Sequence, residues 1–298
     1  MNYHSPVLLK ESVDALDIKE NGVYVDVTFG GGGHSREILS RLGEKGRLFA
    51  FDQDPDAQQN KIDDSRFVLI GENFRFITRF LRFYGVKKVD GVLADLGVSS
   101  HQFDAAERGF STRFDADLDM RMDQKSQLSA KKIINKYEEK ELADILFLYG
   151  ELRNARALAK TIVEARSGNE IKTSFQLKEV LQKFLPKAKE HKILAQIFQA
   201  IRIEVNQELE VLKEFLEQMP QLLNADGRLS IISYHSLEDR LVKRFIRTGM
   251  FSGELEKDVF GNTDEPLKKI GKLVVPTFQE VKENNRARSA KLRVAALK

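Results

Sequence analysis

The residues most suggestive of chemistry lie in the segment VYVDVTFGGGGHSREIL, Val23 to Leu39. An apolar run that predicts a strand ends here in four consecutive glycines, which His34, Ser35 and a helical pattern follow. Glycine loses more backbone entropy on folding than any other residue, so four in a row would weaken a regular element. A flexible connector is one interpretation. The interpretation that we favour is a loop that lets a ligand lie against the backbone at a helix N-terminus.

An acidic residue, Asp52, ends the next strand pattern, 22 residues after Gly30. A carboxylate at this position can accept hydrogen bonds from both hydroxyls of a ribose. The alternative, a turn or helix-capping aspartate, fits Asp54 better. A dinucleotide fingerprint ends in a glycine that makes room for pyrophosphate, and Ser35 stands at that position here. The loop therefore suits a ligand without pyrophosphate, such as S-adenosylmethionine.

Two further strand ends carry candidate residues. Phe74, just past the third strand, can form a wall for adenine or belong to a helix core. Asp95 ends the fourth strand, with Gln102 close behind it. An exocyclic amine is a poor nucleophile, so its methylation needs an acceptor that orients the N–H and an accurate in-line placement of the methyl group. Asp95 can orient the amine or hold the cofactor, and the sequence leaves both roles open.

The elements that must position these residues alternate in a regular way. Strand patterns at 23–29, 46–54, 66–70 and 89–97 are separated by helical ones. This alternation predicts an α/β fold whose parallel sheet is covered on both faces. From about 130 to 219 only helical patterns occur, and strand character returns at 227–236. We therefore expect an all-helical domain inserted between the fourth and fifth strands.

The composition narrows the class of protein. The chain has 298 residues, of which 42% are hydrophobic and 31% charged, as in a globular protein. No apolar run approaches the ~18 residues needed to span a membrane, and the start lacks a signal-peptide pattern, which favours the cytoplasm. Without cysteine there is no thiolate zinc site, and the five histidines are scattered, so we expect no metal.

The charge pattern leaves only local basic patches as possible binding surfaces for nucleic acid. Net charge is +3, and residues 284–298 hold five basic side chains and no acidic one. Such a tail is either a solvated end or part of an RNA-binding surface, and charge alone does not choose between them.

Taken together, these segments resemble the MraW family of bacterial 16S ribosomal RNA cytosine-N4 methyltransferases. The order and spacing of the matching segments make the resemblance specific. The segments are HSPVLLKESVDAL, VDVTFGGGGHS, FDQDPDA, DGVLADLGVSSHQFDAAERGFS, LDMRMD, FQAIRIEVNQELEVL, SIISYHSLEDRLVKRF and NRARSAKLRVA. Among the small departures, Tyr234 replaces a usual phenylalanine and Leu152 stands where an acid is expected.

The resemblance implies a class I methyltransferase, with a Rossmann-like doubly wound sheet and an inserted all-helical domain. It places the S-adenosylmethionine-binding domain at residues 1–104 and 220–298, and the helical substrate-recognition domain at 105–219. The implied reaction is methyl transfer to the N4 of a cytosine in 16S rRNA of the small ribosomal subunit, in the cytoplasm and without a membrane partner. A homodimer is left open. The implied cofactor contacts are Gly32, Gly33, His34, Asp52, Phe74, Asp95 and Gln102.

The segment YHSLEDR supplies a second candidate for the chemistry beside Asp95. His235, Ser236 and Asp239 are residue types of a hydrolase triad, but three such residues within five positions cannot form one relay. Ser236 with Asp239 instead predicts a pair like a capping box at a helix start. His235, at the end of the fifth strand, is expected at the active-site edge, where it can touch the target base.

Two other functions stay open from sequence. One is a non-enzymatic ribosome-assembly factor that only docks on RNA; the intact set of cofactor residues argues against it. The other is a nicotinamide-dependent dehydrogenase, which Ser35 at the last glycine position disfavours.

Overall fold

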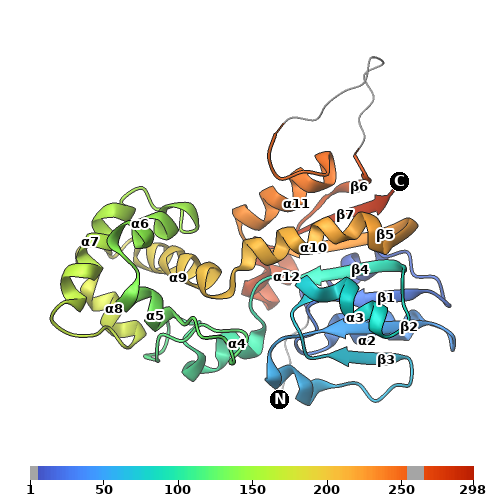
Figure 1. Ribbon diagram of the computed structural model, residues 1–298, viewed down its shortest axis with the longest axis horizontal. Coiled ribbons are helices and arrows are strands. Elements are labelled where there is room, and N and C mark those ends of the chain that lie inside the picture. The colour runs from blue at the N-terminus through green and yellow to red at the C-terminus, as the bar shows by residue number, and fades with distance from the viewer. Residues whose placement is uncertain (1–5, 254–264) are drawn as a thin grey trace. The chain divides into compact units, whose positions relative to one another are not determined.

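The computed structural model describes residues 6–253 and 265–298 (Figure 1). Its internal contacts divide the chain into two compact units. We call Met1–Gly97 with Leu209–Lys298 the sheet unit, and Val98–Glu208 the helical unit.

The sheet unit is built on a seven-stranded sheet with the order β3-β2-β1-β4-β5-β7-β6. The first five strands in this order are parallel, whereas β7 runs antiparallel to both of its neighbours. This order, with one reversed strand beside β5, is that of a class I methyltransferase, so the predicted fold class is confirmed. The strands are β1 (Val23–Asp26), β2 (Arg47–Phe51), β3 (Phe67–Ile70), β4 (Val89–Asp95), β5 (Leu223–Ser233), β6 (Leu267–Val274) and β7 (Lys291–Leu297).

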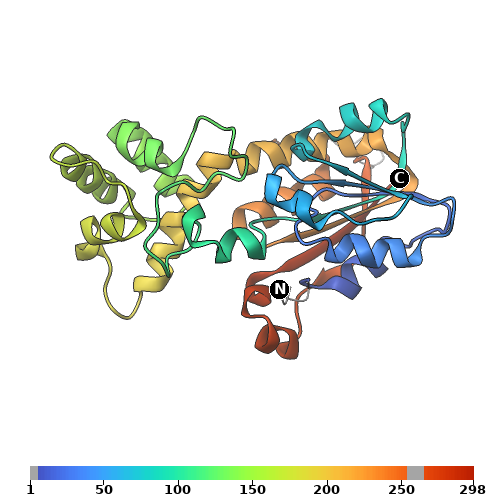
Figure 2. The same cartoon turned by 90° about the horizontal axis from the view of Figure 1, so that it is seen from below.

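Helices cover both faces of this sheet because its strands are apolar on both sides. In β1, Tyr24 packs with the core under α1 (Leu9–Asp14) and α2 (Gly33–Arg41), whereas Val25 packs with the opposite core. That second face is covered by α3 (Ile77–Phe83), α10 (Glu208–Leu222) and α11 (Ser236–Thr248). Figure 2 shows α2 and α3 on opposite sides of the strands. Shorter elements are η1 (Pro55–Asn60), η2 (Phe74–Phe76), α12 (Phe278–Glu283) and η5 (Asn285–Ser289).

The helical unit has a core of its own. Leu146, Leu158, Ile162, Ile197 and Ile201 are almost completely buried together in it. As predicted, residues 130–206 contain helices and no strand; their connections are short and include one isolated bridge, from Thr173 to Asp117. The elements are α4 (Ser100–Asp104), η3 (Ala106–Arg108), α5 (Ala130–Lys136), α6 (Glu139–Leu148), α7 (Ala155–Arg166), α8 (Ser174–Val180), η4 (Gln182–Phe184) and α9 (Glu190–Asn206).

The boundaries of the two units differ from those predicted. The sequence placed them after residues 104 and 219, whereas the compact units meet at 97/98 and 208/209. The second difference has a clear cause, because Leu212, Phe215 and Met219 of α10 pack in the core of the sheet unit. At the first boundary, Val98 packs against the core of the helical unit.

The basic tail is not a solvated end. It forms η5 and then β7, which lies between β5 and β6 within the sheet. Arg293 of β7 donates to Asp239 at 2.6 Å, and Lys291 lies 3.3 Å from the same carboxylate. Lys298 pairs with Glu265, so at least three of the five basic side chains already have acidic partners. Among the helices of the described residues, none has the length and apolar character needed to cross a membrane.

The packing of α10 can be tested by substitution. Phe215 is fully buried, so Phe215→Ala should lower the free energy of unfolding by about 3–5 kcal/mol, the usual cost of such a cavity. Phe83→Ala is the matched control because Phe83 is 81% exposed. Chemical denaturation followed by circular dichroism measures both variants. Equal losses would contradict the assignment of α10 to the core of the sheet unit.

Candidate active site

The predicted site residues of the sheet unit gather at one edge of the sheet. Parallel strands end at the same edge, and this edge is where α/β sheets bind ligands. The loop after β1, the residue after β2, the turn after β3, the end of β4 and the residues after β5 all contribute. The edge therefore holds Gly32, Gly33, His34, Asp52, Phe74, Asp95 and His235, whereas Gln102 belongs to the helical unit.

Two glycines of the glycine loop, Gly32 and Gly33, are required for different structural reasons. Gly32 precedes α2 with φ at 76°, in the left-handed region, and a Cβ there would lie 2.9 Å from the ring of Phe29. At Gly33 a Cβ would lie 2.1 Å from Cγ of Pro6. Gly33 is thus required by the chain's own N-terminal segment, a requirement separate from the predicted approach of a ligand to the loop.

Asp52 connects the glycine loop to the end of β2. Its Oδ2 accepts the Gly30 N–H at 2.8 Å, and its Oδ1 accepts the Asp54 N–H at 2.9 Å. Burial raises the pKa of Asp52 to about 6 in spite of these two donors. As predicted, the capping role belongs to Asp54, whose carboxylate accepts the Asp56 N–H at the start of η1. Asp52 remains half-buried, and each oxygen of a carboxylate can accept a further hydrogen bond.

Asp95 is held by side chains from two other strand ends. The Tyr234 hydroxyl donates to its Oδ1 at 2.7 Å, and Nδ1 of His34 lies 3.9 Å from its Oδ2. Its backbone N–H donates to the Thr28 hydroxyl oxygen at 2.6 Å. Burial raises the pKa of Asp95 to about 6, and the nearby His34 and the Tyr234 hydrogen bond reduce that rise. The side chain keeps 22% of its surface exposed, so a ligand can still reach it.

The ring of His34 is oriented by the N-terminal segment. Its Nε2 lies 3.2 Å from the carbonyl oxygen of Val7, and because a carbonyl only accepts, Nε2 must carry a hydrogen. Nδ1 then faces Asp95, at 3.9 Å from its Oδ2. His34, Asp95 and Tyr234 thus form a partly buried cluster, in which Tyr234 is hydrogen-bonded to Asp95 and His34 lies beyond hydrogen-bond distance from it.

Sequence reasoning missed Asp26, which is fully buried at the end of β1. Its Oδ2 accepts the Ser35 hydroxyl at 2.7 Å, and its Oδ1 accepts the Thr28 N–H at 3.1 Å. Burial raises the pKa of this carboxyl too. Asp26 ties the start of the glycine loop to the first turn of α2. The signal for it was present, since it is the one charged residue in the apolar run VYVDVTF.

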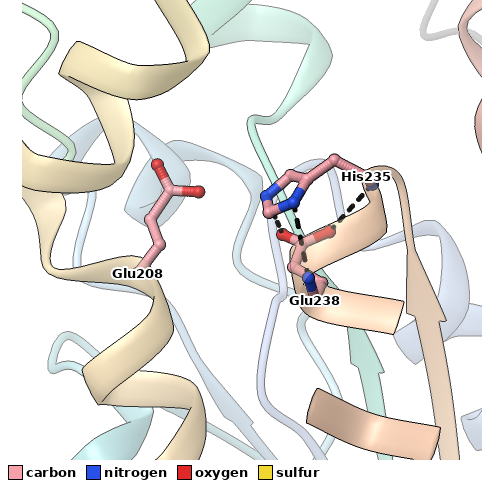
Figure 3. Close-up of side chains that lie close together, drawn as sticks. All are labelled: Glu208, His235 and Glu238. Atoms are coloured by element: carbon pink, nitrogen blue, oxygen red, sulfur yellow. Dashed lines mark hydrogen bonds and ion pairs between the residues drawn. The ribbon is translucent and has the colours of Figure 1, made fainter. Parts of the chain in front are cut away.

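His235 caps α11, and the predicted pairing of Ser236 with Asp239 is wrong (Figure 3). The Glu238 N–H donates to His235 Nδ1 at 3.4 Å, and Glu238 Oε2 accepts the His235 N–H at 3.3 Å. Asp239 instead accepts from Arg293. Only 8% of the His235 side chain is exposed. The structure therefore gives this ring a helix-capping role, and its contact with a target base stays a prediction.

Phe74 and Gln102 are each engaged locally. Phe74 is half-buried at the start of η2, with its ring edge-on to Phe215 and the centroids 5.3 Å apart, so it belongs partly to the core. Gln102, in the helical unit, forms the capping box of α4, in which its Oε1 accepts the Ser99 N–H at 3.1 Å.

The raised pKa of Asp95 should make the stability of the protein depend on pH. A carboxyl whose pKa is higher in the folded state binds its proton more tightly there, so stability falls as the pH rises from about 4 to about 6. Asp95→Asn removes this penalty. At about pH 8 it should raise the free energy of unfolding by up to about 3 kcal/mol, seen as a higher Tm. The gain should disappear by about pH 3, where the carboxyl of the native protein is protonated in both the folded and the unfolded state. A Tm difference independent of pH would contradict the raised pKa.

The whole chain, residues 1–298, matches the MraW methylase family. It is 67% identical to the ribosomal RNA small subunit methyltransferase H of Flavobacterium johnsoniae, over 99% of this chain and 98% of that protein. The enzyme of the same name from Flavobacterium psychrophilum is 65% identical, over 98% of this chain and 100% of that protein. The one from Bacteroides fragilis strain ATCC 25285 is 54% identical, over 99% of this chain and 98% of that protein. With such similarity along its full length, this chain belongs to the MraW methylase family.

Proposed function

We propose that this protein transfers a methyl group from S-adenosylmethionine to the N4 of a cytosine in 16S rRNA of the small ribosomal subunit. Membership of the methylase family gives the reaction class. Of the observations on this chain, the one that carries the proposal is the partly buried cluster of Asp95, His34 and Tyr234, at the same sheet edge as Asp52 and the glycine loop.

The residues at the edge fit this cofactor. Asp52 keeps acceptor capacity for the ribose hydroxyls, and Phe74 offers its half-buried ring to the adenine. Asp95 is a partly buried carboxylate whose nearest basic group, His34, is 3.9 Å away, so a positively charged ligand would offset the cost of its burial. S-adenosylmethionine, when bound, supplies a methyl group activated by its sulfonium and carries an ammonium group as well.

Asp95 has capacity for two roles. With its pKa at about 6 it is mostly ionised at neutral pH, and Tyr234 occupies only Oδ1. We assign it to cofactor binding, with orientation of the amine N–H as a second role. Gln102 remains a proposed cofactor contact on the family resemblance alone. We also propose that the helical unit recognises the substrate.

The experiment that tests this function compares native protein with Asp95→Asn. Small ribosomal subunits lacking the modification are the substrate, and mass spectrometry of nucleosides detects N4-methylcytidine. Cofactor affinity should fall about ten- to hundredfold, as for a lost hydrogen bond to a charged group. If Asp95 also orients the amine, turnover at saturating cofactor should fall a further ~10²–10⁴-fold.

The result separates this function from its alternative. A native protein that binds RNA but neither binds S-adenosylmethionine nor forms N4-methylcytidine would be the docking factor considered above. An Asp95→Asn variant with native affinity and native turnover would contradict both roles of Asp95.

The glycine loop is tested with a matched pair of glycines. Gly32 and Gly85 both have positive φ, but only at Gly32 would a Cβ meet other atoms within 4 Å. Gly85→Ala should lose about 1–2 kcal/mol of stability to backbone strain, and Gly32→Ala should lose more, because its Cβ also meets the ring of Phe29. Only Gly32→Ala should also weaken cofactor binding in calorimetric titration. Equal cofactor affinities would make the loop a connector and not a cradle.

His235→Asn separates capping from chemistry. Asparagine is a good N-cap residue, so this variant should keep the stability of α11, whereas His235→Ala should lose about 1 kcal/mol. If the imidazole touches the target base, turnover of both variants should fall alike. Native turnover in a stable His235→Asn protein would leave His235 only its capping role.

We place the reaction in the cytoplasm, where bacterial ribosomal subunits are assembled. The homodimer that the sequence leaves open is tested by sedimentation equilibrium of the native chain.

A further inference from the structure

The segment from Asn73 to Lys88, NFRFITRFLRFYGVKK, is unusual for a helix that covers a sheet. It contains five basic and five aromatic residues and no acidic one. Only part of this content is needed for packing. Ile77 and Leu81 of α3 are fully buried against the sheet, as expected for an amphipathic helix.

The outer side of α3 leaves aromatic rings in water. Phe83 is 81% exposed, Phe76 is 41% exposed and Tyr84 is 38% exposed. The Phe83 and Tyr84 rings meet edge to face, with centroids 5.3 Å apart. A single exposed aromatic residue is ordinary, but a run of them along one helix points to a binding surface.

The cations among these rings are largely without counterions. Arg75 pairs with Glu214, and Lys88 donates to the carbonyl oxygen of Leu223. By contrast, Arg79, Arg82 and Lys87 are exposed and form no ion pair with any residue that the structure describes. Arg79 lies with its guanidinium 6.0 Å from the ring centroid of Phe80.

These exposed residues form what we call the α3 patch: Phe76, Arg79, Arg82, Phe83, Tyr84 and Lys87. Residues three, four and seven positions apart share a face of a helix, which brings Phe76, Arg79 and Phe83 together. The patch begins in η2, the same short turn that starts with Phe74. Its Phe76 end therefore lies beside the sheet edge that carries the candidate active site, and the rest of the patch follows α3 towards the start of β4, at the opposite edge.

We propose that the α3 patch binds a single-stranded segment of ribosomal RNA. Unpaired cations interleaved with exposed aromatic rings match the phosphates and the unstacked bases of a single strand. Arg79, Arg82 and Lys87 neutralise phosphates, and Phe83 stacks on a base. A second copy of this chain is disfavoured as the partner, because two such patches would bring like charges together. The inference rests on the proposed function, from which RNA is the substrate.

The charges are tested with the triple variant Arg79→Gln, Arg82→Gln, Lys87→Gln. The matched control is Lys10→Gln, Lys45→Gln, Lys243→Gln, which removes three exposed cations from other parts of the sheet unit. Fluorescence anisotropy measures the affinity of each full-length protein for a labelled single-stranded RNA from 16S rRNA at several salt concentrations. The slope of log affinity against log salt should shrink by about 0.7 per lost contact, or about 2 for three. The control should keep the native slope.

The stacking is tested with Phe83→Ala. Loss of one base stack should weaken RNA binding about 5- to 100-fold, and Phe83→Tyr should retain it. Phe278→Ala is the control, because Phe278 is also an exposed phenylalanine of the sheet unit, at 85%. S-adenosylmethionine affinity, measured by calorimetry, should be native in all of these variants.

The outcomes separate the patch from the proposed function. If the native protein methylates the subunit and both α3 variants bind RNA like their controls, the patch assignment is overturned and the function stands. If the native protein binds RNA through the patch but forms no N4-methylcytidine, the function fails and the patch stands. If Phe83→Ala leaves RNA affinity native and converts a native dimer to a monomer in sedimentation, the patch is a self-association surface.

Discussion

The burial of three carboxylates at one edge of the sheet is the constraint on which the site depends. Asp26 and Asp95 end β1 and β4, and Asp52 directly follows β2; these strands are adjacent, in the order β2-β1-β4. Burial raises the pKa of each, and the charge of Asp26 adds to the rise at both Asp52 and Asp95. Negative charge gathered in a medium of low polarity favours a ligand that brings positive charge. S-adenosylmethionine brings both a sulfonium and an ammonium.

The surrounding fold supplies the donors that keep these carboxylates in place. Backbone N–H groups from the glycine loop and from the turn after β2 meet Asp52, and the hydroxyls of Ser35 and Tyr234 meet Asp26 and Asp95. Gly30 and Tyr234 follow strands adjacent to those of Asp52 and Asp95, so these two contacts require the parallel alignment of the sheet. The N-terminal segment contributes as well, because the Val7 carbonyl accepts from His34.

The alternation of strand and helix patterns was enough to predict the parallel sheet and the edge at which the candidate residues meet. What local patterns could not supply were the contacts between distant parts of the chain. Pro6 requires Gly33, and Tyr234 binds Asp95 across 139 positions of sequence. Neither contact can be predicted from the local sequence around these residues. The domain boundary at α10 was missed because an amphipathic helix has the same periodicity whichever core it covers. The cap of α11 was misplaced by one residue, since both His235 and Ser236 precede an acid three positions on.

Ionised carboxylates at this edge of the sheet receive a positively charged cofactor, and the pH dependence of cofactor binding tests this role most directly. Calorimetric titration of the native chain with S-adenosylmethionine between about pH 5 and about pH 7 spans the pKa of about 6 of both Asp52 and Asp95. Because the ligand favours the ionised forms, affinity should weaken as the pH falls through 6, by up to about tenfold per pH unit for each carboxyl. Binding near pH 6 should also release protons, seen as a dependence of the measured heat on the buffer. Affinity that is constant over this range, with no proton release, would contradict the account.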